Sequence, residues 1–146
     1  MDGSGEMTGD STRCVHSSLD PEVTTGSVHT PIFQTSTYVQ NDFADHLGYE
    51  YARGDNPTRN ALQRALAEME SPHQEAYGFC FGSGMAAITT ISQMLQQGDH
   101  VIACDDLYGG TVRLFDQIAS RFGIETSYSP LKSGDLGKVV RDNSKI

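Results

Sequence analysis

Apolar residues recur every three or four positions in three stretches of the chain. This spacing is typical of amphipathic helices that cover a core with one face. The stretches are residues 57–70, 85–95 and 112–122. The positions that define the three apolar faces are Leu62, Ala65, Leu66, Met69, Met85, Ile88, Ile91, Leu95, Val112, Phe115, Ala119 and Phe122.

Residues with known helix-capping tendencies lie at the ends of these stretches. Asn56 followed by Pro57 is a favourable N-cap and first helical residue, and Ser71-Pro72 predicts the end of the first helix. Gly98 and Gly123 follow the other two stretches, as expected for residues just past a helix C-terminus. Thr111 is a candidate N-cap for the third helix.

Short apolar runs alternate with these helices and predict strands. The runs are residues 77–81, 101–104 and 124–128, and residues 144–146 resemble the opening of another strand after a short helix at 133–141. Strands that alternate with helices at this spacing imply parallel βαβ units. We therefore expect an α/β fold with a mostly parallel sheet, flanking helices, and ligands beyond the carboxyl ends of the strands.

The N-terminal third of the chain lacks such a pattern. Residues 1–12 are polar and glycine-rich, and we expect a disordered tail there. We expect residues 13–59 to form an arm of extended and loop segments that ends in a polar loop. We expect residues 60–146 to form a partial α/β domain. An arm with little core of its own is expected to lie on another surface, such as a second subunit.

Gly82-Ser83-Gly84 stands between the first predicted strand and the second helix. A sharp strand-to-helix turn leaves backbone N–H groups unpaired at the positive end of the helix dipole, and these suit a phosphate. An ordinary tight connection without a ligand explains the same residues equally well. Earlier in the chain, Tyr51 and Arg53 lie two residues apart, so an extended backbone would direct both side chains to one side. They are a candidate second phosphate clamp or an ordinary surface pair.

Composition excludes several classes of function. The 146 residues carry a net charge of −9 without a basic stripe, which disfavours nucleic acid and anionic membranes. No apolar run is long enough to span a membrane, and no secretory signal is apparent. Three widely spaced cysteines match neither a disulfide framework nor a metal motif. We expect a cytoplasmic protein without a metal site.

The glycine turn also has a second interpretation. Residues 82–87 fit the pattern G-x-G-x-x-A, and Asp105 follows about 20 residues later at a strand end. This is the outline of an NAD-binding fingerprint of a Rossmann-domain oxidoreductase. It leaves Tyr51, Arg53 and the loop around Tyr108 unexplained.

Four motifs in order carry a more specific resemblance. They are Tyr51-Ala-Arg-Gly-Asp-Asn-Pro-Thr-Arg59, Gly82-Ser-Gly-Met-Ala-Ala87, Gly98-Asp-His100 and Asp106-Leu-Tyr-Gly-Gly-Thr111. From about Arg13 onward the chain resembles the Cys/Met-metabolism family of pyridoxal-phosphate enzymes, which includes the cystathionine γ-lyases and γ-synthases. The resemblance implies the N-terminal arm and first part of the large domain of the aspartate-aminotransferase fold, in a homotetramer with active sites shared across a dimer interface.

The resemblance also implies roles for individual residues. Ser83, Gly84 and Met85 would bind the phosphate of pyridoxal 5'-phosphate, the last two through backbone N–H groups. Tyr51 and Arg53 would reach the phosphate of the neighbouring subunit's cofactor. Tyr108 would stack on the pyridine ring and serve as a catalytic residue that moves protons.

Family membership further implies γ-elimination or γ-replacement on cystathionine or an O-acylhomoserine. Gly110 stands where methionine γ-lyases of the family carry Cys, and this favours the cystathionine enzymes. The family's Schiff-base lysine, pyridinium-binding acid and carboxylate-binding arginine lie further along the chain than residue 146. We therefore expect a fragment that is inactive alone, with a non-catalytic remnant as the remaining alternative. The motifs do not separate lyase, synthase and sulfhydrylase.

Overall fold

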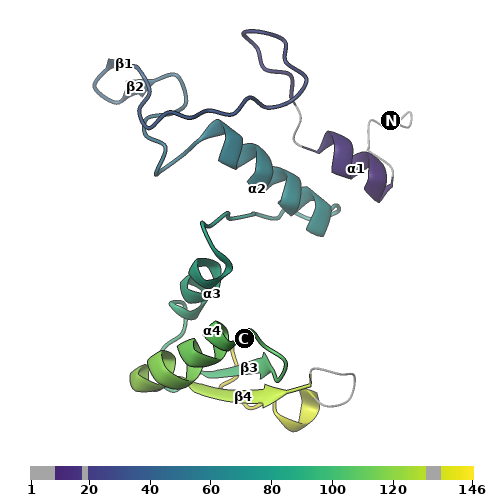
Figure 1. Ribbon diagram of the computed structural model, residues 1–146, viewed down its shortest axis with the longest axis vertical. Helices are drawn as coiled ribbons and strands as arrows, with labels where there is room; N and C mark the ends of the chain where they lie inside the picture. Colours follow the sequence, from purple (N-terminus) through teal and green to yellow (C-terminus); the bar gives the residue numbers. More distant parts are fainter. Residues whose placement is uncertain (1–8, 18–19, 131–135) are drawn as a thin grey trace. The chain divides into compact units, whose positions relative to one another are not determined.

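The computed structural model describes residues 9–17, 20–130 and 136–146. The chain divides into two compact units, Met1–Cys80 and Phe81–Ile146 (Figure 1). The order of elements is α/β, as expected, and each unit is described separately below.

The first unit begins with a short helix, α1 (Asp10–His16). We expected a disordered tail to residue 12 and an arm without regular structure after it. The helix corrects this for residues 10–16, where Asp10 in the first turn and Arg13 near the end complement the helix dipole. Residues 1–8 lie outside the described part, so the proposed boundary at residue 12 stays a prediction. Further along, β1 (Gln40–Asp42) and β2 (Asp45–His46) form a small antiparallel hairpin.

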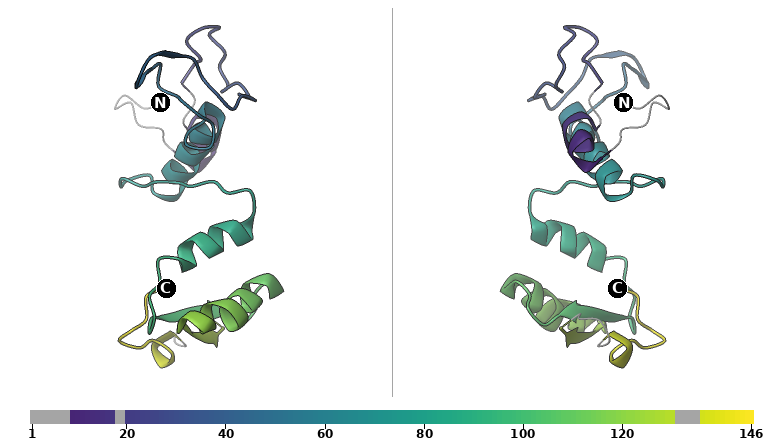
Figure 2. Two further views of the ribbon diagram at one scale, coloured as in Figure 1. Left: turned by 90° about the vertical axis from the view of Figure 1, so that its left-hand side faces the viewer. Right: turned by 90° about the vertical axis from the view of Figure 1, so that its right-hand side faces the viewer.

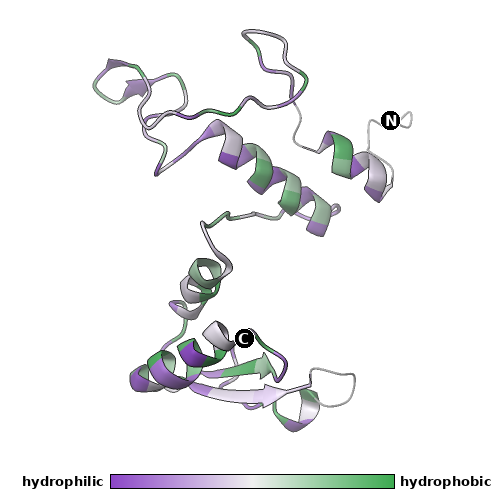
Figure 3. Ribbon diagram, in the orientation of Figure 1, coloured by the Kyte–Doolittle hydropathy of each residue, from purple (hydrophilic) through white to green (hydrophobic). Residues whose placement is uncertain are grey.

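Helix α2 (Pro57–Glu70) has the predicted bounds. The Asn56 side chain accepts hydrogen bonds from the backbone N–H groups of Thr58 and Arg59, and Pro57 occupies the first turn. Apolar and polar residues alternate around the helix (Figure 3). Within the described part of this unit, Ala67 is the one buried apolar residue.

The predicted strand at residues 77–81 is not formed. A strand requires a neighbour for its backbone hydrogen bonds, and this segment lies along α2 instead. The Cys80 N–H donates to Oε1 of Gln63 at 3.0 Å, and a Cβ placed on Gly78 would fall 2.3 Å from the Gln63 carbonyl oxygen. Tyr77 and Phe79 are exposed.

The second unit starts with α3 (Gly84–Ser92), which ends three residues before the predicted Leu95. Residues 93–95 continue as turns, with the Met94 N–H bonded to the Ile91 carbonyl and the Leu95 N–H bonded to the Ser92 carbonyl. Gly98 has a φ of 89°, in the left-handed region that glycine adopts without strain.

Strands β3 (His100–Cys104) and β4 (Glu125–Ser129) pair in parallel, as predicted. Residues 144–146 begin to pair with the other edge of β3, through a parallel bridge from His100 to Ser144. The β3 strand therefore lies between two parallel neighbours. A core formed by Val101, Phe115, Ala119 and Ile124 joins this sheet to the helical segment that runs along it (Figure 2).

That helical segment changes its winding along its length. It consists of α4 (Gly109–Arg113), a π-helical turn (Leu114–Ile118) and a 3-10 turn (Ala119–Phe122), and it closes at Gly123 with a φ of 74°. Tyr108, not Thr111, precedes its first residue; Thr111 is buried inside the first turn. Ala119, which directly follows the π turn, lies in the core as predicted. Phe122, at the end of the 3-10 turn and also predicted on the core face, is 67% exposed.

Tyr128 connects β4 to the π-helical turn. Its hydroxyl donates to Oδ1 of Asp116 at 2.7 Å. Burial and the Asp116 carboxylate raise the pKa of Tyr128 to about 12. Of the expected short helix at 133–141, the described residues contain a 3-10 turn at Leu136–Lys138, and residues 133–135 lie outside them.

Candidate functional site

The first turn of α3 presents two free backbone donors. Ser83 precedes the helix in an extended conformation, and its hydroxyl accepts from the Ala86 N–H at 3.1 Å. Its carbonyl accepts from the Ala87 N–H. Within the described residues, the N–H groups of Gly84 and Met85 have no hydrogen-bond partner. A Cβ placed on Gly84 would meet no atom within 4 Å, so the space beside this residue is open.

The start of α4 lies against the start of α3. Oγ1 of Thr111 donates to Sδ of Met85 at 3.7 Å, within the range for a weak bond to sulfur. A Cβ placed on Gly110 would fall 2.4 Å from Cε1 of Tyr108 and 3.2 Å from Sδ of Met85. The Tyr108 ring thus packs on the bare backbone of Gly110, beside Met85. The structure thus places Tyr108 near Met85, the second residue of α3, and the roles assigned to Ser83, Gly84, Met85 and Tyr108 stay predictions.

The topology of the sheet agrees with a ligand site near the starts of α3 and α4. Strand β4 and residues 144–146 lie on opposite sides of β3, so the connection that follows β4 returns to the other side of β3. In open α/β sheets, ligands bind beyond the carboxyl ends of the strands at such a switch point. Residues 105–108 form the loop that leaves the carboxyl end of β3, and Tyr108 at the end of this loop is 70% exposed.

Tyr51 and Arg53 lie in the first unit and contact each other. The Arg53 guanidinium carbon lies 5.3 Å from the centre of the Tyr51 ring, a cation–π contact. We expected an extended backbone to direct both side chains to one side. Instead the chain turns after Tyr51, whose carbonyl accepts from the N–H groups of Gly54 and Asp55. The turn brings the guanidinium over the ring.

Sequence reasoning gave no role to Arg59, which stabilises this turn. Its guanidinium donates to the carbonyls of Ala52 at 2.9 Å and Gly54 at 2.7 Å. A signal was available, because Arg59 lies one turn into a helix whose N-cap directly follows the loop. A side chain in the first turn points back toward the helix N-terminus, and so toward this loop.

Asn56 and Thr58 attach the arm to the start of α2. Nδ2 of Asn56 donates to the Phe33 carbonyl at 3.1 Å. Oγ1 of Thr58 donates to the Pro31 carbonyl at 2.8 Å and accepts from the Phe33 N–H at 2.9 Å. These bonds fix the extended segment beside the loop that carries Tyr51 and Arg53.

A hollow of about 480 Å³ lies in the same loop, lined in part by His46, Glu50, Tyr51, Arg53 and Asp55. Glu50 pairs with His46 at 3.4 Å. Among the described residues, Arg53 has no carboxylate partner within ion-pair distance. The guanidinium is therefore available to an anion from outside the unit, although Glu50 and Asp55 make the hollow itself weakly acidic.

The described part of the chain contains no cluster of three or more His, Cys, Asp and Glu side chains able to hold a metal ion. In the same residues, no helix has the length and apolar character needed to cross a membrane.

Comparison with known proteins gives consistent results. A family model described as "Cys/Met metabolism PLP-dependent enzyme" matches residues 11–146. The chain is 49% identical over 139 residues to a probable cystathionine gamma-synthase of Herpetosiphon aurantiacus, covering 94% of this chain and 43% of the relative. It is 44% identical over 140 residues to a cystathionine beta-lyase of Lactococcus lactis subsp. cremoris, covering 95% of this chain and 36% of the relative.

A solved structure has the same fold. The crystal structure of a cystathionine gamma-lyase from Lactobacillus plantarum, complexed with L-serine, superimposes with a TM-score of 0.80 at 32% identity. The match covers 94% of this chain and 35% of that one. The chain thus spans between 35% and 43% of the length of these relatives.

The NAD-binding interpretation requires a strand directly before Gly82. Residues 75–83 contain none, and Asp105 follows β3 as expected for either interpretation.

Proposed function

The chain belongs to the Cys/Met metabolism family of PLP-dependent enzymes, and from that membership we propose that its residues bind pyridoxal 5'-phosphate in a trans-sulfuration enzyme. The observation that carries the proposal is the capped start of α3 near the Tyr108 ring, where the N–H groups of Gly84 and Met85 have no hydrogen-bond partner among the described residues.

The residues fit this cofactor in their chemistry. A phosphate needs several donors and little steric hindrance, and the start of α3 offers the N–H groups of Gly84 and Met85 with the positive end of the helix dipole behind them. The Ser83 hydroxyl oxygen accepts from the Ala86 N–H, and the hydroxyl proton is available for donation to an anion. Tyr108 offers an exposed aromatic face for a pyridine ring.

Each residue has a distinct role in the proposed reaction. When bound, the cofactor would supply an electron sink for this chemistry. Gly84 and Met85 would hold its phosphate and so position it. Tyr108 would offer its ring face to the cofactor, and its hydroxyl would move a proton during elimination or replacement.

Tyr51 and Arg53 are proposed to act on a second subunit of the same protein. The cation–π contact holds the guanidinium over the Tyr51 ring and leaves its N–H groups for a phosphate. Large apolar side chains of the arm and hairpin are exposed, with Val23 and Phe43 both at 98%. Their exposure supports a covering subunit in a homo-oligomer.

The phosphate-binding role can be tested on the 146-residue chain with amide NMR. Pyridoxamine 5'-phosphate is the probe, because it lacks the aldehyde that would react with lysines, and pyridoxamine without the phosphate is its control. We expect the Gly84 and Met85 resonances to shift with the phosphorylated probe and not with pyridoxamine. Equal shifts with both probes would refute the role.

A matched pair of variants isolates one donor. Gly84→Pro removes the N–H group while proline is well tolerated at the first helical position, and the extended Ser83 suits a following proline. Gly84→Ala retains the N–H group in open space. A hydrogen bond to a charged group contributes about 1.5–3 kcal/mol, so Gly84→Pro is expected to weaken binding about ten-fold or more. Equal affinities for both variants would argue against the donor.

The substrate class requires an assay on a longer protein that contains these residues and the family's lysine. With cystathionine, cleavage on the γ side yields cysteine, ammonia and 2-oxobutyrate, whereas β cleavage yields homocysteine, ammonia and pyruvate. With an O-acylhomoserine and cysteine, replacement yields cystathionine and releases the acyl group as its carboxylic acid. We expect one of these products from the longer protein and none from residues 1–146 alone. Absence of all products from the longer protein would favour a non-catalytic remnant.

A further inference from the structure

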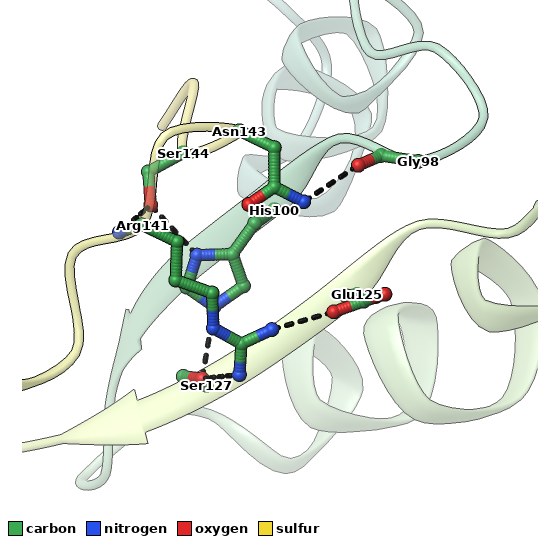
Figure 4. A network of polar contacts seen from close by, with 7 residues as sticks. All are labelled: Gly98, His100, Glu125, Ser127, Arg141, Asn143 and Ser144. Carbon is green, nitrogen blue, oxygen red and sulfur yellow. Dashed lines mark hydrogen bonds and ion pairs between the residues drawn. The ribbon is translucent and has the colours of Figure 1, made fainter.

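His100 is a completely buried ionisable residue that the proposed function does not use. It begins β3, and its two ring nitrogens contact two serine hydroxyls in different parts of the unit (Figure 4). Nδ1 lies 2.7 Å from Oγ of Ser144, and Nε2 lies 2.8 Å from Oγ of Ser127 in β4. One imidazole thus joins three segments of the chain.

The segment at residues 141–146 makes further bonds around this ring. The Arg141 N–H donates to Oγ of Ser144 at 2.9 Å, and the Arg141 guanidinium donates to Oγ of Ser127 at 3.1 Å. Nδ2 of Asn143 donates to the Gly98 carbonyl at 2.7 Å. The backbone adds bonds from the His100 N–H to the Asn143 carbonyl and from the Lys145 N–H to the His100 carbonyl, each 2.9 Å long.

The surroundings favour a neutral imidazole. A neutral ring has one donor and one acceptor, so one serine accepts from it and the other donates to it. Burial lowers the pKa of His100, and the positive charge of Arg141 lowers it further, while Glu125 opposes the shift. Glu125 is itself paired with Arg141. The carboxylate of the neighbouring Asp99 accepts from the Gln96 N–H.

We propose that His100 attaches residues 141–146 to β3 in an acid-sensitive way. It holds them against β3 while its ring is neutral and releases them when the ring takes up a proton. A protonated ring would donate from both nitrogens, so the hydroxyl that had donated to it would lose its acceptor. It would also place a second positive charge beside Arg141. Because residues 144–146 form one neighbour of β3, their release would unpair one edge of that strand.

The direction of the pH effect follows from the lowered pKa. The unfolded or released histidine binds a proton near its ordinary pKa of 6.5, whereas the buried ring resists protonation until a lower pH. The attached state is therefore fully favoured above pH 6.5 and loses its advantage as the pH falls below it. Within that window, each pH unit favours release by about ten-fold.

NMR on the 146-residue chain can test the proposal. Side-chain nitrogen shifts report the protonation of His100, and amide exchange corrected for intrinsic rates reports the attachment of residues 141–146. We expect His100 to titrate below its ordinary pKa. The Lys145 amide, and the Ile102 amide that donates to the Ile146 carbonyl, should exchange about ten-fold faster per pH unit in the same window. Titration at an ordinary pKa, or exchange independent of His100 protonation, would overturn the proposal.

Two variants separate the attachment role of His100 from a general sensitivity of the chain to acid. His100→Asn retains a neutral hydrogen-bonding side chain, so the acid-dependent rise in Lys145 exchange should disappear, while the exposed His73→Asn control should keep it. If His100→Asn fails to fold, Ser144→Ala removes one partner of the ring and should raise Lys145 exchange at neutral pH. Unchanged exchange in Ser144→Ala would refute a role for the contact.

Discussion

Gly110 has a role that depends on its having no side chain. Its backbone supports the Tyr108 ring so closely that a Cβ would fall within 3 Å of two ring carbons, at 2.4 Å and 2.9 Å. Met85 contributes the third contact at 3.2 Å. The residue therefore determines where the Tyr108 ring lies relative to the free N–H groups of α3.

Substituting Gly110 with alanine is expected to displace the Tyr108 ring. The methyl group would occupy the space of the ring edge, and Tyr108 is exposed enough to rotate away. Loss of nuclear Overhauser contacts between the Tyr108 ring and the Met85 methyl group would report the movement. The matched control is Gly82→Ala, where a Cβ meets nothing within 4 Å and the contacts should persist. Persistence in Gly110→Ala would contradict the packing argument.

At the residue level, the sequence predicted the features that depend only on the backbone conformation of neighbouring residues. The glycine-serine turn alone predicted unpaired donors, because they follow from any helix start, whereas the family resemblance named Gly84 and Met85 as the residues that carry them. Arg59 and His100 were assigned no role. Their partners lie in other segments, such as the loop at Ala52 and the hydroxyls of Ser127 and Ser144, and residue spacing contains no information on such contacts.

At the level of elements, helix α2 depends on a residue that serves both the helix and the arm. The side-chain oxygen of Asn56 caps the helix, and the side-chain nitrogen of the same residue donates to the Phe33 carbonyl. The helix end and the arm are consequently stabilised by one side chain.

Replacement of Asn56 by alanine should lower the free energy of unfolding of this unit by about 1–2 kcal/mol, at the upper end of measured cap losses. Denaturant unfolding followed by circular dichroism measures the change. Asn60→Ala is the control, since Asn60 lies within the same helix and helix propensity alone favours alanine there. An equal effect of the two substitutions would show that the cap bonds contribute little.

The elements that were predicted correctly are those with local signals. Residues 57–70 have a cap, a first-turn proline and a periodic face, and the bounds of α2 agree. The expected strand at 77–81 has the right composition but no neighbour with which to pair. The changes of winding at Leu114–Ile118 and Ala119–Phe122 leave no mark in a pattern of apolar spacing, and Phe122, predicted on the core face, is exposed.

At the level of the whole molecule, the packed interior is unevenly distributed. The core of Val101, Phe115, Ala119 and Ile124 lies in the second unit, whereas Ala67 is the buried apolar residue of the first among the described positions. Buried apolar contacts are the main source of resistance to local opening. The two units should therefore differ in stability.

Hydrogen exchange measured by mass spectrometry should reveal this difference. Peptides that contain β3 and β4 are expected to be the most protected, and peptides from residues 20–55 the least, because their backbone is mostly exposed. Peptides of α2 should be intermediate. Protection of α2 equal to that of β3 would contradict the inference from burial and would indicate additional contacts made by the first unit in solution.

The position of β3 between two parallel neighbours has a consequence for association of the chain with itself. A strand segment with both edges paired offers no backbone groups to another molecule. Among the described residues, β3 has a neighbour on both edges from His100 to Ile102, through β4 on one side and residues 143–146 on the other. The first part of this central strand is thereby protected from edge-to-edge aggregation by its own neighbours.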